Sequence, residues 1–386
     1  MNVISIYLHI PWCLERCPYC DFNTRAAREW PEERYAQALL SELDQRVQES
    51  PFADSAVDTI FLGGGTPSLF APATIGKLLD GIGRTQSVTA DAEITLETNP
   101  GSTDVDRLRG FRQAGINRLS LGVQTFTPHL LHALGRQHSV DDSREALRDA
   151  RTAGFQNLSL DLIHAIPGQS QTELEADLSE ALSFETDHIS AYSLTYEPGT
   201  PLTRDLERGR VERLTNEAEA EMFETIRQVL PAAGLDAYEI SNFARPGFEA
   251  RHNQAYWRGV PYIGLGAGAH SYRPGTGENG SFGRRWMNLR EPAAYMEAVE
   301  ADGLAESESE ELTRQQAMGE GCWLALREGR GLDTRGFRDR YGEGALQAYP
   351  HIPELCEQGM LEWSEEWLRL TPRGLLAADE VFASFF

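Results

Sequence analysis

The chain has 386 residues, of which 41% are hydrophobic, and it carries a formal net charge of −24 at pH 7. This length exceeds the size at which one hydrophobic core usually stops growing, so we expect one large domain and a smaller one. The negative charge argues against duplex nucleic acid and anionic lipid as partners, because both are bound by clustered cationic side chains.

The cysteine content and the N-terminus predict a cytoplasmic protein. Five cysteines are a sparse, odd number for this length, and the first residues lack a basic region followed by a long apolar core. We therefore expect neither export nor a disulfide framework. No apolar stretch approaches the roughly 20 residues that span a bilayer, although transient membrane contact stays open, as does the choice between monomer and homodimer.

Apolar segments of strand length recur through the first two thirds of the chain, at residues 4–10, 59–65, 93–98, 118–124, 157–163, 188–194 and 237–241. Segments with helical periodicity, such as residues 31–48 and 139–153, lie between them. Alternating strands and helices indicate parallel pairing. The pattern predicts an α/β barrel of six or seven units, complete or partial, with a doubly wound open sheet as the alternative.

The pattern changes near residue 245. We assign residues 1–245 to the barrel, residues 246–290 to a connector rich in glycine and aromatic residues, and residues 291–386 to a small, mostly helical C-terminal domain. The glycines at 264–268 resemble a nucleotide-binding fingerprint, but no βαβ unit surrounds them. The acidic run at 305–312 is expected to be a solvated face.

Three cysteines follow the first predicted strand at C-x3-C-x2-C spacing: Cys13, Cys17 and Cys20. Structural zinc takes four ligands, usually from paired motifs, and Cys322 and Cys356 are too far along the chain to form a second pair. A 4Fe–4S cluster is usually held by four thiolates, so three would leave one iron open. We favour this cluster; zinc with Asp21 or His9 as a further ligand, or free thiols, are the alternatives.

Polar residues gather where the predicted strands end, which is where α/β folds place their chemistry. These residues are Gly64, Gly65 and Thr66 of a glycine run, followed by Glu97, Gln124 and Asp161. The glycines permit close approach of a ligand, with successive amides facing an anionic or zwitterionic group. Taken singly, each residue has a structural alternative, such as capping a helix or satisfying a loop amide.

Seven motifs together resemble the radical S-adenosylmethionine (SAM) superfamily, in the branch that contains the anaerobic coproporphyrinogen III dehydrogenase and a related heme chaperone: YLHIPWCLERCPYCDF, GGGTP, LETNP, LGVQTF, LGRQH, DLIHAIPGQ and HNQAYW. The resemblance covers nearly the whole chain. It implies a partial (β/α)6 barrel in which the three cysteines hold a 4Fe–4S cluster. The open iron would chelate SAM, and the GGGTP run would receive the methionine amino group.

The same resemblance implies a set of cofactor-binding residues: Tyr7, Tyr19, Gly64, Gly65, Thr66, Glu97, Gln124, Arg136 and Asp161. Tyr7 and Tyr19 match aromatic contact positions, and Glu97 matches a carboxylate suited to the ribose hydroxyls. The other six match positions that line either the primary SAM or a second SAM found in the dehydrogenase. Whether one or two molecules bind therefore stays open.

Two departures from the dehydrogenase favour the chaperone. The dehydrogenase has a further cysteine two residues after the third, where this chain has Asp21-Phe22. The segment HNQAYW resembles a chaperone motif whose histidine, His252 here, is a candidate heme ligand, and neutral imidazole ligates heme iron. The alternative is that His252 satisfies a buried hydrogen bond while Tyr256 and Trp257 pack at the domain junction.

The resemblance thus implies a protein that binds heme and delivers it to respiratory apoproteins. Whether it is also an enzyme stays open. One alternative is oxygen-independent oxidative decarboxylation of coproporphyrinogen III, and a more distant one is a zinc-stabilised binding module.

Overall fold

Six parallel strands form the centre of the computed structural model, which describes residues 2–277 and 280–386. Met1 and two positions of the predicted connector, residues 278 and 279, lie outside the described residues. The strands pair in chain order, each parallel to the next: β1 (Val3–Ile10), β4 (Ala56–Gly64), β5 (Val88–Thr98), β6 (Arg118–Gln124), β7 (Asn157–His164) and β8 (His188–Ser193). They confirm the predicted α/β class. The two ends of the described sheet do not pair, so the barrel is partial.

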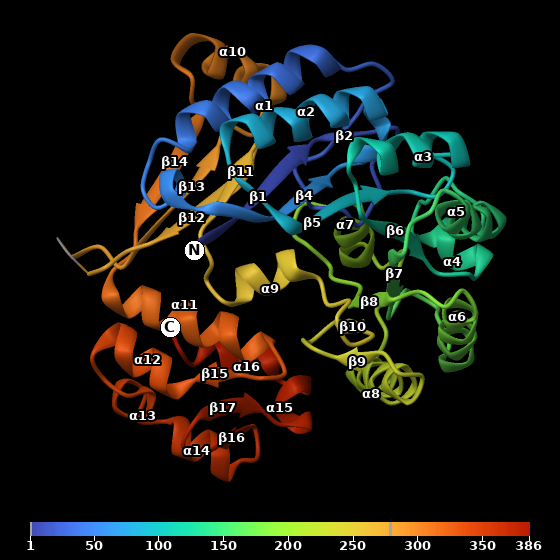
Figure 1. Cartoon of the computed structure of the whole chain (residues 1–386). Coiled ribbons are helices and arrows are strands. Elements are labelled where there is room, and N and C mark those ends of the chain that lie inside the picture. Colours follow the sequence, from blue (N-terminus) through green and yellow to red (C-terminus); the bar gives the residue numbers. More distant parts are fainter. Residues whose placement is uncertain (1, 278–279) are drawn as a thin grey trace.

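Helices lie around the outside of the curved sheet (Figure 1). One helix, α7 (Pro201–Glu207), lies instead at the carboxyl edge of the strands, where the amide of Leu202 donates to Pro18 O at 2.9 Å. The outer helices are α1 (Glu32–Arg46), α2 (Pro72–Thr85), α3 (Val105–Ala114), α4 (Pro128–Ala133), α5 (Val140–Thr152), α6 (Gln171–Ser183) and α8 (Asn216–Ala232). Two of them begin with capping boxes, formed by Ser139 with Asp142 and by Ser170 with Glu173, which satisfy amides that a helix start leaves unpaired. In the described part of the chain, no helix combines the length and apolar character needed to cross a membrane.

Four strands extend the sheet beyond β1: β11 (Tyr262–Leu265), β12 (His270–Pro274), β13 (Gly283–Asn288) and β14 (Glu306–Glu311). β11 is parallel to β1, and the other three continue antiparallel. The predicted connector is therefore built largely into the sheet. The acidic run forms the edge strand β14 because Arg284 and Arg285 of β13 pair with its glutamates.

The seventh predicted strand, at residues 237–241, is wrong. Two shorter strands, β9 (Asp236–Ala237) and β10 (Asn242–Ala244), pair antiparallel with each other, and β10 is antiparallel to β8. The residues between them form a turn. Its apolar side chain, Ile240, packs on the hydrophobic core of the C-terminal domain and not on the sheet, so the apolar character of this segment does not indicate a strand.

The C-terminal domain has its own hydrophobic core, which begins at Leu312 and ends at Phe385. It is mostly helical, with a three-stranded sheet, and contains α11 (Arg314–Arg327), β15 (Leu332–Asp333), α12 (Thr334–Tyr341), α13 (Ala345–Ala348), α14 (Ile352–Glu357), β16 (Leu361–Trp363), β17 (Trp367–Leu370), α15 (Pro372–Leu376) and α16 (Ala378–Ala383). Residues 291–311 contribute instead α10 (Pro292–Asp302), which packs on α1, and the edge strand β14. We therefore propose a domain boundary near residue 312.

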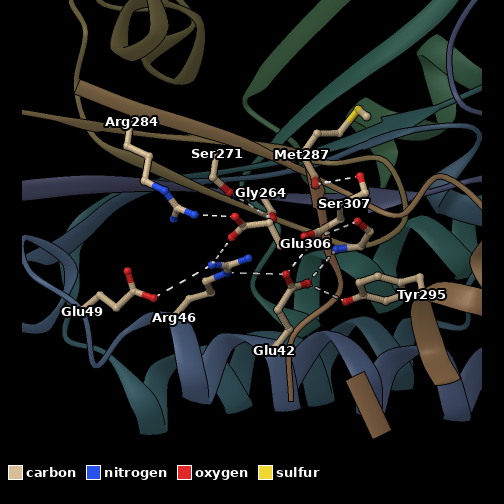
Figure 2. A network of polar contacts seen from close by, with 12 residues as sticks. Glu42, Arg46, Glu49, Gly264, Ser271, Arg284, Met287, Tyr295, Glu306 and Ser307 are labelled. Atoms are coloured by element: carbon tan, nitrogen blue, oxygen red, sulfur yellow. Dashed lines mark hydrogen bonds and ion pairs between the residues drawn. The ribbon is translucent and has the colours of Figure 1, made fainter. Parts of the chain in front are cut away.

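A buried polar network fastens α1 to the added strands (Figure 2). The fully buried carboxylate of Glu42 accepts hydrogen bonds from Tyr295 Oη at 2.7 Å and from the amide of Gly266 at 3.2 Å. Arg46, one helical turn later, donates to Glu306 Oε2 of β14 at 3.2 Å. Burial raises the pKa of Glu42. The network holds the loop that contains Gly266 against the barrel.

Candidate functional site

The loop that carries the three cysteines is closed at its base by two short parallel strands, β2 (Trp12–Cys13) and β3 (Arg25–Ala26). The amide of Ala27 donates to Cys13 O at 2.9 Å. Within the loop, the amide of Cys20 donates to Cys17 O at 3.2 Å. This closure gathers the cysteines on one short segment at the carboxyl end of β1.

The three thiols are free and partly exposed. Burial, together with the neighbouring Cys20 and Cys17, raises the pKa of Cys13 to about 11, whereas the Thr66 hydroxyl lowers it. In residues 2–277 and 280–386, no three His, Cys, Asp or Glu side chains are arranged to hold a single metal ion. A 4Fe–4S cluster binds thiolates through several irons, so separated thiols suit it better than one tetrahedral zinc ion.

Arg136 and Thr66 donate to cysteine sulfurs from two sides. Arg136 Nη1 is 3.4 Å from Cys17 Sγ, and Thr66 Oγ1 is 3.6 Å from Cys13 Sγ. Asn99 joins them, since its Oδ1 accepts from Arg136 Nη2 at 3.0 Å and its Nδ2 donates to Thr66 Oγ1 at 2.9 Å. Hydrogen bonds and positive charge beside sulfur ligands tune the potential of an iron–sulfur cluster. This donor set fits such a cluster.

Four of the predicted cofactor residues meet at the carboxyl edge of the barrel. The amide of Gly64, at the end of β4, donates to Glu97 Oε2 of β5 at 3.1 Å. Asp161 on β7 accepts from Ser120 Oγ, which is 3.1 Å from both carboxylate oxygens. Tyr7 on β1 lies close enough to Glu97 for that carboxylate to raise its pKa, after burial. These residues form a polar floor beside the cysteine loop.

Glu97 is a buried carboxyl of this floor whose pKa is raised. Burial, followed by the charge of Asp161, raises its pKa to about 8, while the amide of Gly64 and the charge of Arg118 act in the opposite direction. A carboxylate in this position can accept hydrogen bonds from a diol. Its raised pKa means that such a ligand must bind the minority, ionised form near neutral pH.

Gln124, Arg136 and Tyr19 lie together at the other side of the cysteines. A Cβ atom on Gly122 would lie 2.7 Å from Arg136 Nη2 and 2.8 Å from Gln124 Nε2, so both side chains cover this glycine. Gln124 ends β6 in the left-handed region, with φ 72°, a conformation that is uncommon outside glycine. Burial raises the pKa of Tyr19, whose ring lies beside Arg136 and Cys17; the charge of Arg136 opposes this shift and that of Cys17 adds to it.

The glycine run does not present its amides to a ligand, which corrects the sequence-based expectation. The amide of Gly65 donates to Ile10 O and that of Thr66 to Trp12 O, both at 2.8 Å. The amide of Gly64 donates to the carboxylate of Glu97. Gly64 has φ 110°, which favours glycine. What the run can offer to an ammonium group is carbonyl oxygen, which has two lone pairs.

The candidate heme ligand His252 lies on α9 (Arg251–Trp257) and is 1% exposed. Thr59 Oγ1, which donates to Ser5 Oγ at 2.8 Å, must accept from His252 Nδ1 at 2.7 Å. Nε2 therefore accepts the hydroxyl of Tyr256 at 2.9 Å. Burial lowers the pKa of His252 to about 3. Direct ligation of iron would require Tyr256 to leave Nε2.

A cavity of about 920 Å³ lies between the barrel edge and the C-terminal domain. Tyr7 and Glu97 line its barrel side, and Tyr256 and Trp257 of α9 line its wall, whereas Trp323 of α11 comes from the small domain. Figure 1 shows α9 between the sheet and α11. Because the cavity reaches Glu97, it is continuous with the polar floor.

Sequence reasoning missed residues that position the site. Asn23, just after the cysteines, donates to Ala267 O and Arg290 O, both at 2.9 Å, and so ties the cysteine loop to the glycine loop beside β12. Asn99, just after the strand that carries Glu97, links Arg136 and Thr66, the two side chains that donate to the cysteine sulfurs. Its position in the LETNP motif was the available signal; for Asn23 there was none.

Comparison with known proteins decides the family. Residues 7–181 match the radical SAM superfamily, and residues 312–377 match the HemN C-terminal domain. The chain is 37% identical over 383 residues to the heme chaperone HemW of Bacillus subtilis (strain 168), covering 99% of this chain and 98% of that protein. The chain belongs to the HemW family of radical SAM proteins. This confirms the resemblance described above.

Two further matches agree with this family. The heme chaperone HemW of Escherichia coli (strain K12) is 43% identical over 274 residues, which cover 69% of each chain. The structure of coproporphyrinogen III oxidase (HemN) from Escherichia coli, a radical SAM enzyme, superposes with a TM-score of 0.83 at 23% identity, covering 100% of this chain and 90% of that one. That similarity shows that the HemW family member described here shares the HemN fold.

Membership in the radical SAM superfamily implies a 4Fe–4S cluster and SAM. The arrangement of the side chains fits both groups. The three thiols with Arg136 and Thr66 provide sulfur ligands and donors to sulfur, and the adjoining polar floor provides carboxylates. The two sites share the carboxyl edge of the barrel.

Proposed function

We propose that this protein binds heme and delivers it to respiratory apoproteins, and that its three cysteines hold a 4Fe–4S cluster that binds SAM. The cavity between barrel and small domain carries the proposal. Its aromatic side chains suit the faces of a flat macrocycle, and its arginines suit carboxylates at the edge. Relatives that match 99% of the chain carry the name heme chaperone, which supports heme as the cargo.

Asp21 and Phe22 support delivery over decarboxylation. Both line the cavity immediately after the last cysteine, and the Phe22 side chain is 63% exposed. Exposure of an aromatic ring to water is unfavourable in free energy. Contact with an apolar ligand at the mouth of the cavity would remove the ring from water and so relieve this cost. A flat hydrophobic cargo would cover this ring.

In the proposed cofactor site, Cys13, Cys17 and Cys20 would hold the cluster. When bound, the cluster supplies a redox-active iron with an open coordination position. Glu97 accepts the ribose hydroxyls, and the carbonyl oxygens of the glycine run accept the methionine amino group. Arg136, Gln124, Tyr7, Tyr19 and Asp161 shape the walls and set the charge of the site. The number of SAM molecules bound per chain, one or two, is measured by equilibrium binding.

The proposed function is tested on one anaerobically reconstituted sample by two measurements. Titration with heme, followed by absorbance, should reach saturation at one heme per chain. Incubation with coproporphyrinogen III, SAM and a reductant should release no carbon dioxide above the level of a sample without protein. Turnover of the porphyrinogen would overturn heme delivery in favour of a dehydrogenase, and a failure to bind heme would also refute the proposal.

SAM binding should tighten as the pH rises from 7 to 9. If the ribose hydroxyls require the ionised Glu97, whose pKa is about 8, the dissociation constant falls by about tenfold over this interval and then levels off. Calorimetric titration of the reconstituted protein measures this. Glu97→Gln should bind more weakly with a flat pH profile, whereas Glu365→Gln, on the far small domain, should keep the wild-type profile. An unchanged slope in Glu97→Gln would assign the titration to another group.

A further inference from the structure

We infer that His270 is the axial ligand of heme iron in this cavity, and that Arg340 binds a carboxylate at the porphyrin edge. The inference rests on the proposed heme-binding function and deepens it. It replaces the sequence-based candidate His252, whose ring lies behind Tyr256 in the cavity wall.

Among the nine histidines of the chain, two line the described cavity, His9 and His270. Both ring nitrogens of His9 are hydrogen-bonded within the protein: Nε2 donates to Asn23 O at 2.9 Å, and Nδ1 accepts from the Tyr7 hydroxyl at 3.0 Å. The His270 side chain is exposed to the cavity, and within the described ranges no hydrogen bond engages either of its ring nitrogens. It is therefore the cavity histidine that can offer a nitrogen to iron.

The surroundings of His270 keep its imidazole in the ligating form. Burial and the nearby Arg290 and Arg285 lower its pKa, and the charge of Glu308 opposes them only in part. A neutral imidazole has a lone pair for a metal, whereas imidazolium has none. His270 is thus available for ligation at neutral pH without first losing a proton.

Arg340 lies beside the same face of β12. His270 and Tyr272 are two residues apart on this strand, so their side chains project to one side, and both line the cavity. Arg340 Nη2, from α12 of the small domain, donates to Tyr272 Oη at 3.1 Å. This bond holds the guanidinium beside the strand face that carries His270.

Arg340 has no protein carboxylate to neutralise it in the part of the chain that the structure describes. Of the five arginines that line the described cavity, two form ion pairs, Arg258 with Glu328 at 2.8 Å and Arg285 with Glu320 at 2.6 Å. Arg340 differs from both in that its described partner at the cavity is a neutral hydroxyl, that of Tyr272. Guanidinium groups bind carboxylates through charge-assisted hydrogen bonds. A porphyrin carboxylate is the ligand group that this cation fits.

The two contacts come from different parts of the molecule. β12 belongs to the extended barrel sheet, whereas α12 belongs to the second hydrophobic core. A heme held by both would bridge the barrel and the small domain. The iron ligand and the carboxylate partner can then be tested independently.

The test of the iron ligand uses the full-length, reconstituted protein and ferric heme, with resonance Raman and absorbance spectra as readouts. His270→Ala should weaken heme binding by about tenfold or more and lose the imidazole-ligated spectrum, which added imidazole should restore. His270→Met should give the altered spectrum of a thioether ligand. His252→Gln and the surface variant His132→Ala should keep the wild-type spectrum.

The outcomes separate this inference from the proposed function. If the wild-type protein binds no heme, the proposed function fails. If it binds heme and His270→Ala and His270→Met keep the wild-type spectrum while His252→Gln loses it, heme binding stands and the assignment to His270 is overturned. Iron content and circular dichroism equal to wild type in each variant show that the chain has folded.

The carboxylate partner is tested with heme and its dimethyl ester, which lacks the anionic edge. The wild-type protein should bind heme more tightly than the ester. Arg340→Gln should lose about tenfold in heme affinity, with little change for the ester, because only the carboxylate contact is removed. Equal losses for both ligands would show that Arg340 acts only through packing and would overturn this half of the inference.

Discussion

Cys17→Ser should abolish cluster assembly. The serine hydroxyl does not replace a thiolate, which is the species that binds iron, and two cysteines on so short a loop leave two irons without protein ligands. After anaerobic reconstitution, iron and sulfide content should fall from about four per chain to near background, and the broad visible absorbance of the cluster should be absent.

The matched control is Cys356→Ser on α14. This cysteine is partly buried in the C-terminal domain, so its replacement should leave the iron content at the wild-type level. If Cys17→Ser retained a full complement of iron, or if the wild-type protein took up tetrahedral zinc and no iron under strict anaerobic conditions, the assignment of the three cysteines would be wrong.

Arg46→Ala should destabilise the protein by about 3 kcal/mol or more, because it leaves Glu42 as an uncompensated buried charge. The Arg46 side chain is 1% exposed, and its Nε lies 3.8 Å from Glu42 Oε1. It lies over the ring of Trp286 at 4.8 Å and donates to Glu306 at 3.2 Å. Its loss removes both contacts and loosens β13 and β14 from α1. The midpoint of urea unfolding measures the effect.

The matched control is Arg34→Ala on the same helix. Arg34 also pairs with a glutamate across the α1–α10 contact, at 2.6 Å from Glu300 Oε1, but both side chains are exposed. Exposed ion pairs contribute little, so its unfolding midpoint should match that of the wild type. Arg46→Lys should fall between Arg46→Ala and wild type, because lysine keeps the charge and loses the planar contact with Trp286. Equal midpoints for both alanine variants would refute a structural role for the network.

The barrel was predictable because its signals are local. A parallel strand buried on both faces leaves an apolar run, as in Arg118–Gln124, where every residue is buried. The chemistry of such folds lies at the carboxyl ends of the strands, so Gly64, Glu97 and Asp161 could be grouped before any contact was known.

The added strands were not predictable in the same way. Residues 262–288 contain many glycine and aromatic residues, and the acidic run 305–312 has the composition of a solvent-facing segment. Their strand conformation depends on partners that are distant or oppositely charged, such as Arg284 and Arg285 for the glutamates of β14. Composition alone therefore predicts a connector over residues 246–290 and places residues 305–312 in a mostly helical domain, where the structure has a continuation of the sheet.

The histidines also show that the direction of a side chain cannot be predicted from a short motif. A short motif singled out His252, but the direction of a side chain on a seven-residue helix depends on what packs against it. Here Thr59 and Tyr256 take both ring nitrogens. His270 is of interest in the sequence only because it follows a glycine run, and its place beside the cavity depends on the packing of β12 and the small domain.

By itself, the sequence determined the cysteine loop, the order of the parallel strands and the family. These features could be predicted because ligand spacing and strand periodicity depend only on residues that are close together along the chain. Only the tertiary structure decided which side chains face the cavity and what holds the cysteine loop in place. The bond from Asn23 to Ala267 O joins residues 244 positions apart. Such a contact exists only once the strands between them have paired.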